Sequence, residues 1–198
     1  MASQFGAPKG ARGWLAAQVV ARLTGEANRW MVDRLEVGPD DRVLDVGCGP
    51  GLAVAYAAGP RWASHVVGVD SSEVMVRQAR RRNRRAIVEG RVEIHCGDAA
   101  RLPLPDRSFT AAGSLNSLQF WPAPEKGLAE LHRVLEPGGR VAVVLMARSD
   151  EAPGPRPPPW VEETADRMRD AGFAEVSTAS ETFGAVLHRA LLARRPET

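Results

Sequence analysis

A short apolar run that closes on a cluster of glycines most constrains what this chain can fold into. Residues 42–46 read RVLDV, and the cluster GCGPG follows at residues 47–51, before a helical pattern that reaches Ala58. Glycines between a strand and a helix let the backbone approach a ligand closely, and the helix start offers free amides and partial positive charge. In open α/β sheets such loops bind nucleotide-type ligands at the carboxyl ends of the strands. The segment therefore predicts an α/β fold with a nucleotide-type site after this strand.

Further strand and helix patterns alternate along the chain. Strand-like runs lie at residues 65–69, 91–95, 109–114, 140–147, 174–180 and 185–194. Helical spacings lie at residues 14–35, with a break at Gly25, and at residues 160–171. A further helix is expected to follow the cap candidates Ser71 and Ser72, and another to run from Pro124 to a stop at residues 137–139. This alternation implies a parallel sheet covered on both faces. The proline-rich residues 152–159 predict an extended loop within one domain.

Composition sets the broad class. The 198 residues include 26 Lys and Arg against 24 Asp and Glu, a net charge of +2, and Lys9 and Lys126 are the only lysines. Cys48 and Cys96 make no disulfide framework. No apolar run reaches the ~18–20 residues of a membrane span, and the first residues lack a secretory signal pattern. We therefore expect one domain in the cytoplasm, without a membrane span.

The glycine spacing separates the classes of nucleotide site. A dinucleotide site needs G-x-G-x-x-G, but Leu52 stands where the third glycine belongs, and the G-K-[ST] of a phosphate loop is absent. Asp70 ends the next apolar run, where a carboxylate can accept hydrogen bonds from two ribose hydroxyls. An acid there has no obvious structural duty, and it disfavours a ribose phosphate. The pattern therefore predicts a ribose-containing ligand and does not favour an NAD-dependent oxidoreductase.

The chain resembles the class I S-adenosylmethionine-dependent methyltransferases in four ordered motifs. These are VLDVGCGPG at residues 43–51, VVGVDSSEVMVRQAR at 66–80, GDAARLPLPDRSF at 97–109 and LAELHRVLEPGGRVAVV at 128–144. The likeness is greatest to the small-molecule branch that includes the ubiquinone and menaquinone biosynthesis type, and it covers roughly residues 37–147.

The resemblance implies a Rossmann-like class I methyltransferase fold, with a seven-stranded, mostly parallel sheet and helices on both faces. We expect a single methyltransferase domain over residues 1–198. Residues 1–36 would form an N-terminal helical cover and residues 37–148 the cofactor-binding core. Residues 149–198 would supply the proline loop, a helix and the terminal strands.

The resemblance also implies which positions bind S-adenosylmethionine. Asp45 would lie near the ammonium group of the cofactor, Asp70 would hold the ribose diol, and Asp98 would accept a hydrogen bond from the adenine amino group. The remaining positions are Gly47, Gly49 and Gly51 with Cys48 at the methionine end, Ser71, Met75, Gly97 and Ala99 at the adenosine end, and Asn116. Structural duties stay open for several of them, because Asp suits caps and turns and because Met75 and Cys48 suit a core.

The acceptor half of the site is less defined. Thr110 stands where the family often carries an acid, and Gln119 stands near a position where it often carries a histidine. Asn116 and Gln119 are therefore candidates for orienting the acceptor, because an amide forms hydrogen bonds but removes no proton at neutral pH. Other candidates are His132 and His188 as bases, and Phe120 and Trp121 as an aromatic wall, although core packing would also explain the aromatic pair.

These features predict methyl transfer from S-adenosylmethionine to a small-molecule acceptor by in-line displacement, aided by orientation and desolvation. A metal is not expected, because the His and Cys residues show no zinc-type pairing. One alternative is an RNA-binding protein or nucleic-acid methyltransferase that uses the arginine-rich helix after Ser72, but no aromatics interleave there and the net charge is only +2. Another is a non-catalytic, cofactor-binding partner subunit. The sequence sets neither the acceptor nor an oligomeric state.

Overall fold

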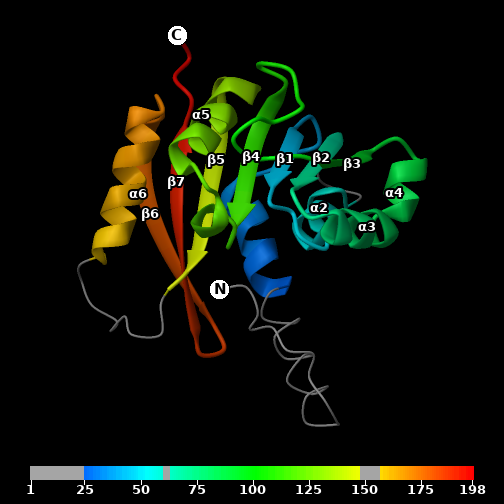
Figure 1. Cartoon of the computed structure of the whole chain (residues 1–198), viewed down its shortest axis with the longest axis horizontal. Helices are drawn as coiled ribbons and strands as arrows, with labels where there is room; N and C mark the ends of the chain where they lie inside the picture. Colours follow the sequence, from blue (N-terminus) through cyan, green and yellow to red (C-terminus); the bar gives the residue numbers. More distant parts are fainter. Residues whose placement is uncertain (1–24, 60–62, 148–156) are drawn as a thin grey trace.

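Seven strands form one mixed sheet in the computed structural model, which describes residues 25–59, 63–147 and 157–198 (Figure 1). The strands are β1 (Arg42–Val46), β2 (His65–Asp70), β3 (Val92–Cys96), β4 (Phe109–Leu115), β5 (Leu135–Met146), β6 (Ala174–Phe183) and β7 (Val186–Arg194). Their order is β3-β2-β1-β4-β5-β7-β6. β1 to β5 pair in parallel, and β7 is antiparallel to both β5 and β6. The predicted α/β fold with a mostly parallel, seven-stranded sheet is confirmed.

Helices cover both faces of this sheet. They are the helical residues 25–34, α2 (Leu52–Ala57), α3 (Glu73–Arg82), α4 (Arg84–Val88), α5 (Pro124–Val134) and α6 (Pro159–Asp170), with a short 3₁₀ turn η1 (Leu118–Phe120). On one face Leu131 of α5 and Met168 of α6 are fully buried against the strands (Figure 1). On the other face Met31, Val54 and Val76 belong to a second buried cluster. Apolar burial on both faces is the main stabilising contribution to the layered fold.

Local sequence signals explain where α3 and α5 begin. Ser72 caps α3, because its Oγ accepts a hydrogen bond from the Met75 amide at 3.4 Å. Pro124 occupies the first turn of α5, where the missing amide costs nothing. The predicted end of α5 at residues 137–139 is wrong: the helix ends at Val134, and these residues belong to the irregular start of β5. Pro137 disfavours the helical conformation for the residue before it, so the chain leaves the helix earlier.

Two predicted segments lie partly outside the described residues. The N-terminal helical pattern is described from residue 25, where the helical residues 25–34 bring Met31 against Gly113 of β4. The proline-rich loop falls mostly within residues 148–156, which are outside the described part of the chain. No helix among the described residues is both long enough and apolar enough to cross a membrane.

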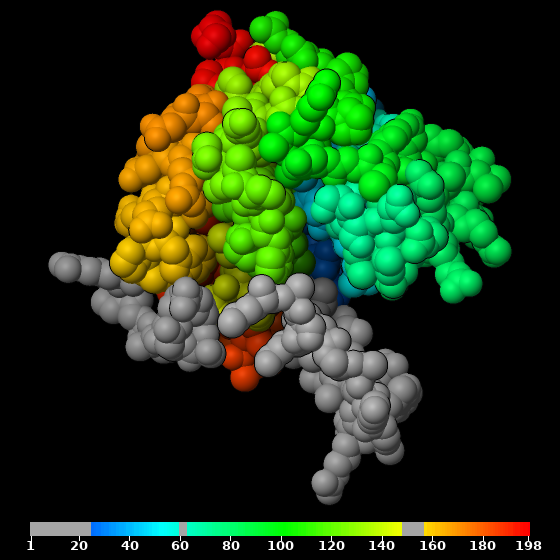
Figure 2. All heavy atoms as spheres, viewed as in Figure 1, coloured from blue at the N-terminus to red at the C-terminus, as the bar shows by residue number. Residues whose placement is uncertain are grey.

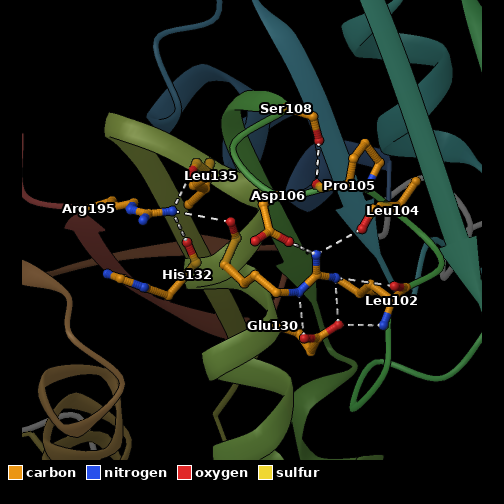
Figure 3. Close-up of polar contacts among 10 residues, drawn as sticks. Leu102, Leu104, Pro105, Asp106, Ser108, Glu130, His132, Leu135 and Arg195 are labelled. Atoms are coloured by element: carbon orange, nitrogen blue, oxygen red, sulfur yellow. Dashed lines mark hydrogen bonds and ion pairs between the residues drawn. The ribbon is translucent and has the colours of Figure 1, made fainter.

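Arg133 of α5 connects the loop between β3 and β4 to the helix layer. Figure 3 labels its partners Leu102, Leu104, Asp106 and Glu130. Its guanidinium donates to both oxygens of Glu130 at 2.7 and 2.8 Å, to Asp106 at 2.5 Å, and to the carbonyls of Leu104 at 2.9 Å and Leu102 at 3.2 Å. Glu130 in turn accepts from the Leu102 amide at 2.7 Å. The Arg133 guanidinium therefore holds the pKa of the Glu130 carboxyl below its ordinary value. The loop so fixed begins at Gly97 and Asp98, beside the end of β3.

Replacing Arg133 by Met should lower the free energy of unfolding by about 2–3 kcal/mol, because several charge-assisted hydrogen bonds are lost and Glu130 keeps a half-buried charge. The measurement is urea unfolding followed by circular dichroism. The matched control is Arg169→Met, which removes an exposed pair with Asp166 one turn away in α6 and should cost less than about 0.5 kcal/mol. Equal losses for the two variants would contradict the anchoring role of Arg133.

Candidate functional site

An open cavity of about 450 Å³ lies at the carboxyl ends of β1, β2, β3 and β4. In the space-filling view it falls in the furrow between α5 and α3 (Figure 2). It is lined by Val46, Gly47, Gly49, Val69, Asp70, Ser71, Gly97, Asp98, Ala99, Leu115, Asn116, Ser117, Phe120, Trp121 and Pro122. The strand order reverses between β1 and β4, and ligands of open α/β sheets bind at such switch points. The volume also lies within the ~300–1,000 Å³ typical of small-molecule sites.

The glycine loop after β1 is packed too closely for side chains. Gly47 has φ +74°, and a Cβ built there would lie 1.8 Å from the Oγ of Ser117. Gly51 has φ +75°, and its Cβ would lie 2.6 Å from the Nδ2 of Asn83. The amides of Gly47, Cys48, Gly49 and Gly51 all donate within the protein. The loop amides are therefore engaged within the protein, and the loop offers a ligand close backbone approach. The expectation of free amides at the start of α2 concerns the residues that follow Gly51 and stays a prediction.

Asp70 holds two segments together at the edge of the cavity. One carboxylate oxygen accepts from the Gly49 amide at 2.8 Å, and the other accepts from the Ser72 amide at 2.8 Å. The expectation that this acid has no structural duty is therefore wrong. Each carboxylate oxygen has two lone pairs, so both oxygens keep acceptor capacity toward the cavity.

The loop after β3 closes the cavity on the side of Asp70. The Gly97 amide donates to the Asp70 carbonyl at 3.1 Å. The Oδ1 of Asp98 accepts from the Ala100 amide at 2.9 Å, so Asp98 is a turn residue as well as a lining residue. Ala99 is buried, and it lines the same wall. The structure therefore brings Ser71, Gly97, Asp98 and Ala99 together with Gly47, Gly49 and Asp70.

Four predicted cofactor positions lie outside the cavity lining. Cys48 and Gly51 belong to the glycine loop but pack against Gly68 and α3, and Met75 is half-buried in the first turn of α3. Asp45 lies within β1 with a relative exposure of 4%. Burial, and secondarily the charge of Asp70, raises the pKa of the Asp45 carboxyl to about 7.

Asn116 stands at the turn that follows β4. Its backbone φ of +51° is uncommon for a residue other than glycine. Its Oδ1 accepts from the Met146 amide at 2.6 Å, and its own carbonyl accepts from the Nε2 of Gln119 at 3.0 Å. Gln119 is exposed and does not line this cavity. Thr110 lies at the opposite end of β4, bonded to Asp41 at 2.5 Å, so the residue at that position is remote from the cavity.

The two candidate bases lie in different places. His132 is near the end of α5, where its ring packs edge-on against Phe173 at 5.2 Å, so it is remote from the cavity. His188 is a buried residue of β7 that pairs in register with Met146 of β5. Burial lowers the pKa of each imidazole. Neither residue lines the cavity.

The aromatic pair after η1 lines the cavity as the wall hypothesis predicted. Phe120 is 75% exposed, and Trp121 donates its indole N–H to the Oγ of Ser117 at 2.9 Å. Sequence reasoning missed Ser117, Leu115 and Pro122, which also line this side. Their position immediately after the apolar run of β4 is the signal that could have found them, because strand ends in this fold border the site.

Four arginines of the predicted arginine-rich helix make contacts within the protein, although their residues are exposed. Arg80 donates to the Ile94 carbonyl at 2.8 Å, Arg82 donates to the Pro50 carbonyl at 2.9 Å, and Arg77 and Arg85 pair with Glu73 and Glu89. These contacts link α3 and α4 to β3 and to the glycine loop. They favour a structural and solvated role for this surface over nucleic-acid recognition.

Comparison with known proteins identifies the family. The family described as "Methyltransferase domain" matches residues 44–143 of the 198 residues, just over half of the chain. The chain therefore belongs to this methyltransferase family. It is a class I S-adenosylmethionine-dependent methyltransferase, and S-adenosylmethionine is its cofactor.

The individual relatives differ in their sequence identity to this chain and in how much of their own length it covers. An uncharacterized methyltransferase of Bacillus subtilis is 25% identical over 93% of this chain and 99% of its own length. The 27-O-demethylrifamycin SV methyltransferase of Amycolatopsis mediterranei is 34% identical over 78% of this chain and 56% of its own length. The chain spans only 29% to 32% of several other curated relatives. The crystal structure of the [4+2]-cyclase SpnF matches with a TM-score of 0.73 at 24% identity, covering 88% of this chain and 82% of that one.

Replacing Gly47 by Ala should weaken binding of S-adenosylhomocysteine at least tenfold by isothermal calorimetry. The new methyl group meets Ser117 and must displace the loop that forms the cavity floor. The control is Gly90→Ala: Gly90 has a similar φ of +72° but open space around its Cβ position. That variant should lose about 1–2 kcal/mol of stability and keep its affinity for the cofactor product. Equal affinities for the two variants would contradict the close-approach role of Gly47.

Replacing Asp45 by Asn should stabilise the cofactor-free protein more at pH 8 than at pH 5. The folded-state pKa of about 7 lies above the unfolded value of 3.8, so the wild type loses stability as pH rises through this range. The asparagine has no charge to bury, and the gain should grow by about 2–3 kcal/mol between the two pH values. Urea unfolding at each pH measures it, with the exposed Asp170→Asn as control. A pH-independent difference would refute the raised pKa.

Proposed function

We propose that this chain transfers a methyl group from S-adenosylmethionine to a small-molecule acceptor that approaches along the segment Asn116–Pro122. The observation that carries the proposal is the composition of the cavity, which joins the glycine loop, Asp70 and the turn at Asp98 to that segment. The glycine loop, Asp70 and the turn at Asp98 suit the cofactor. The segment Asn116–Pro122 forms the remaining wall, where a second ligand can bind.

Each part of the cofactor would contact a different group of residues in the cavity. Asp70 would accept from the ribose hydroxyls with the acceptor capacity that its bonds to Gly49 and Ser72 leave over. Asp98 and Ala99 would border the adenine, and Gly47 would border the methionine end. Asp45 would act from beneath the loop, where its charge is available only above a pH of about 7 in the free protein.

The residues around the reaction centre act mainly by orientation and exclusion of water. The bound cofactor supplies an electrophilic methyl group on a sulfonium, so the protein need not create one. Asn116 is fixed by its bond to the Met146 amide and can hold an acceptor in line. Phe120, Trp121 and Pro122 shield that place from solvent. The described lining of the cavity contains no histidine, so we propose that the acceptor is nucleophilic without a base from this wall.

Two further points support a small molecule in place of a nucleic acid. A relative that is 34% identical carries the name of a rifamycin methyltransferase. Four arginines of α3 and α4 make contacts within the protein. We also propose that residues 1–198 act as a single methyltransferase unit in the cytoplasm. The expected cover formed by residues 1–36 lies mostly outside the described residues.

Replacing Asp70 by Asn should weaken binding of S-adenosylhomocysteine at least tenfold by calorimetry. The amide keeps one acceptor oxygen, so the ribose loses half of its acceptor set and all of the charge assistance. Because Asp70 also anchors α3, the matched control is Ser72→Ala, which removes the helix cap but leaves the carboxylate. That control should lose about 1 kcal/mol of stability and bind the cofactor product normally. Wild-type protein that binds neither cofactor nor product would overturn the proposed function.

A further inference from the structure

We infer that the methyl acceptor is a large, mostly apolar and uncharged organic molecule whose body occupies a second cavity beside the cofactor cavity. The inference rests on the proposed function and assigns its substrate class. The second cavity measures about 1,000 Å³. It lies between η1, the end of β5, the first half of α6 and the hairpin that joins β6 to β7. This volume is at the upper end of small-molecule sites, so it suits a ligand of drug size.

Apolar side chains form most of the wall of this second cavity. Leu118, Leu145, Trp160 and Leu187 converge on it from four different elements. Met146 also lines it and is 52% exposed. The contact with an apolar ligand would remove this surface from water and supply the binding free energy.

The charges around the second cavity favour a neutral ligand. Its charged lining residues are Glu163 and Arg167, which are both exposed and lie on successive turns of α6. Recognition of an ionised group away from water needs a buried partner of opposite charge, and neither side chain is buried. The polar lining residues Gln119, Thr164 and Thr182 suit a few orienting hydrogen bonds to hydroxyl or carbonyl groups.

The two cavities share one thin wall. Trp121 lines both of them. It is held in place by its bond to Ser117, and by Gly127, where an added Cβ would lie 2.3 Å from the indole ring. Beside it, Asn116 lines the cofactor cavity and bonds the amide of Met146, which lines the second cavity. We place the body of the acceptor in the second cavity and its methyl-accepting polar atom at this shared edge, next to Asn116.

The test first measures binding with a neutral apolar fluorophore, N-phenyl-1-naphthylamine, on the full chain saturated with S-adenosylhomocysteine. The blocking variant is Thr182→Trp, which places an indole in the second cavity. The matched control is Thr178→Trp, because Thr178 is also exposed on β6, four residues earlier on the same face, but outside the cavity lining. We expect the wild type and Thr178→Trp to bind the fluorophore equally. Thr182→Trp should bind it at least tenfold more weakly.

The second measurement follows methyl transfer from labelled S-adenosylmethionine to a cell extract separated into solvent-extractable and water-soluble fractions. The label should enter the extractable fraction with the wild type and with Thr178→Trp, and it should fall at least tenfold with Thr182→Trp. All three proteins should bind S-adenosylhomocysteine with equal affinity.

Three results would overturn the inference: equal fluorophore binding by both tryptophan variants, weaker fluorophore binding by the wild type with S-adenosylhomocysteine bound than without it, or label confined to water-soluble material. Failure of the proposed function would look different. In that case the wild type would bind no cofactor product, or it would label neither fraction.

Discussion

The carboxylate of Asp70 is the contact on which the rest of the site depends. It joins the amide of Gly49, in the loop after β1, to the amide of Ser72, at the start of α3. Two segments about twenty residues apart in the chain thus meet at the end of β2. The same residue uses its backbone carbonyl to accept from Gly97. One aspartate therefore sets the spacing between three loops, and the shape of the cavity follows from that spacing.

Side chains of the surrounding helices hold the loops around the cavity in place by hydrogen bonds to their backbone. Arg133 fixes the loop that begins at Asp98, and Asn83 donates to the carbonyls of Gly51 and Ala79 at 3.1 and 2.9 Å. Arg82 bonds the Pro50 carbonyl in the same loop. Several polar side chains far from any ligand thus hold the backbone on which the lining residues sit. Preorganisation of this kind reduces what a ligand must order when it binds.

Much of this could be predicted from the sequence, for physical reasons. Strands such as β1 and β2 are buried on both faces and bounded by glycine or aspartate, so their apolar runs predicted where they begin and end. The ordered motifs predicted many of the residues that line the cofactor side of the cavity. The sequence could not show that Asp70 would bond Gly49, because that contact depends on how two loops pack. The motif comparison at Thr110 concerned a position remote from the cavity, because a motif does not show how far a residue lies from the end of its strand. The shared wall at Trp121 needs three-dimensional neighbours and has no signal in the sequence.

The left-handed conformation of Asn116 has one more consequence. A non-glycine residue with φ of +51° is held there at some conformational expense, and the bond to the Met146 amide keeps it so. This conformational free energy is spent when the chain folds, before any acceptor binds. The hydrogen bond to Met146 therefore orients the Asn116 side chain at the junction of the two cavities before an acceptor arrives, so the binding of each acceptor has less to order.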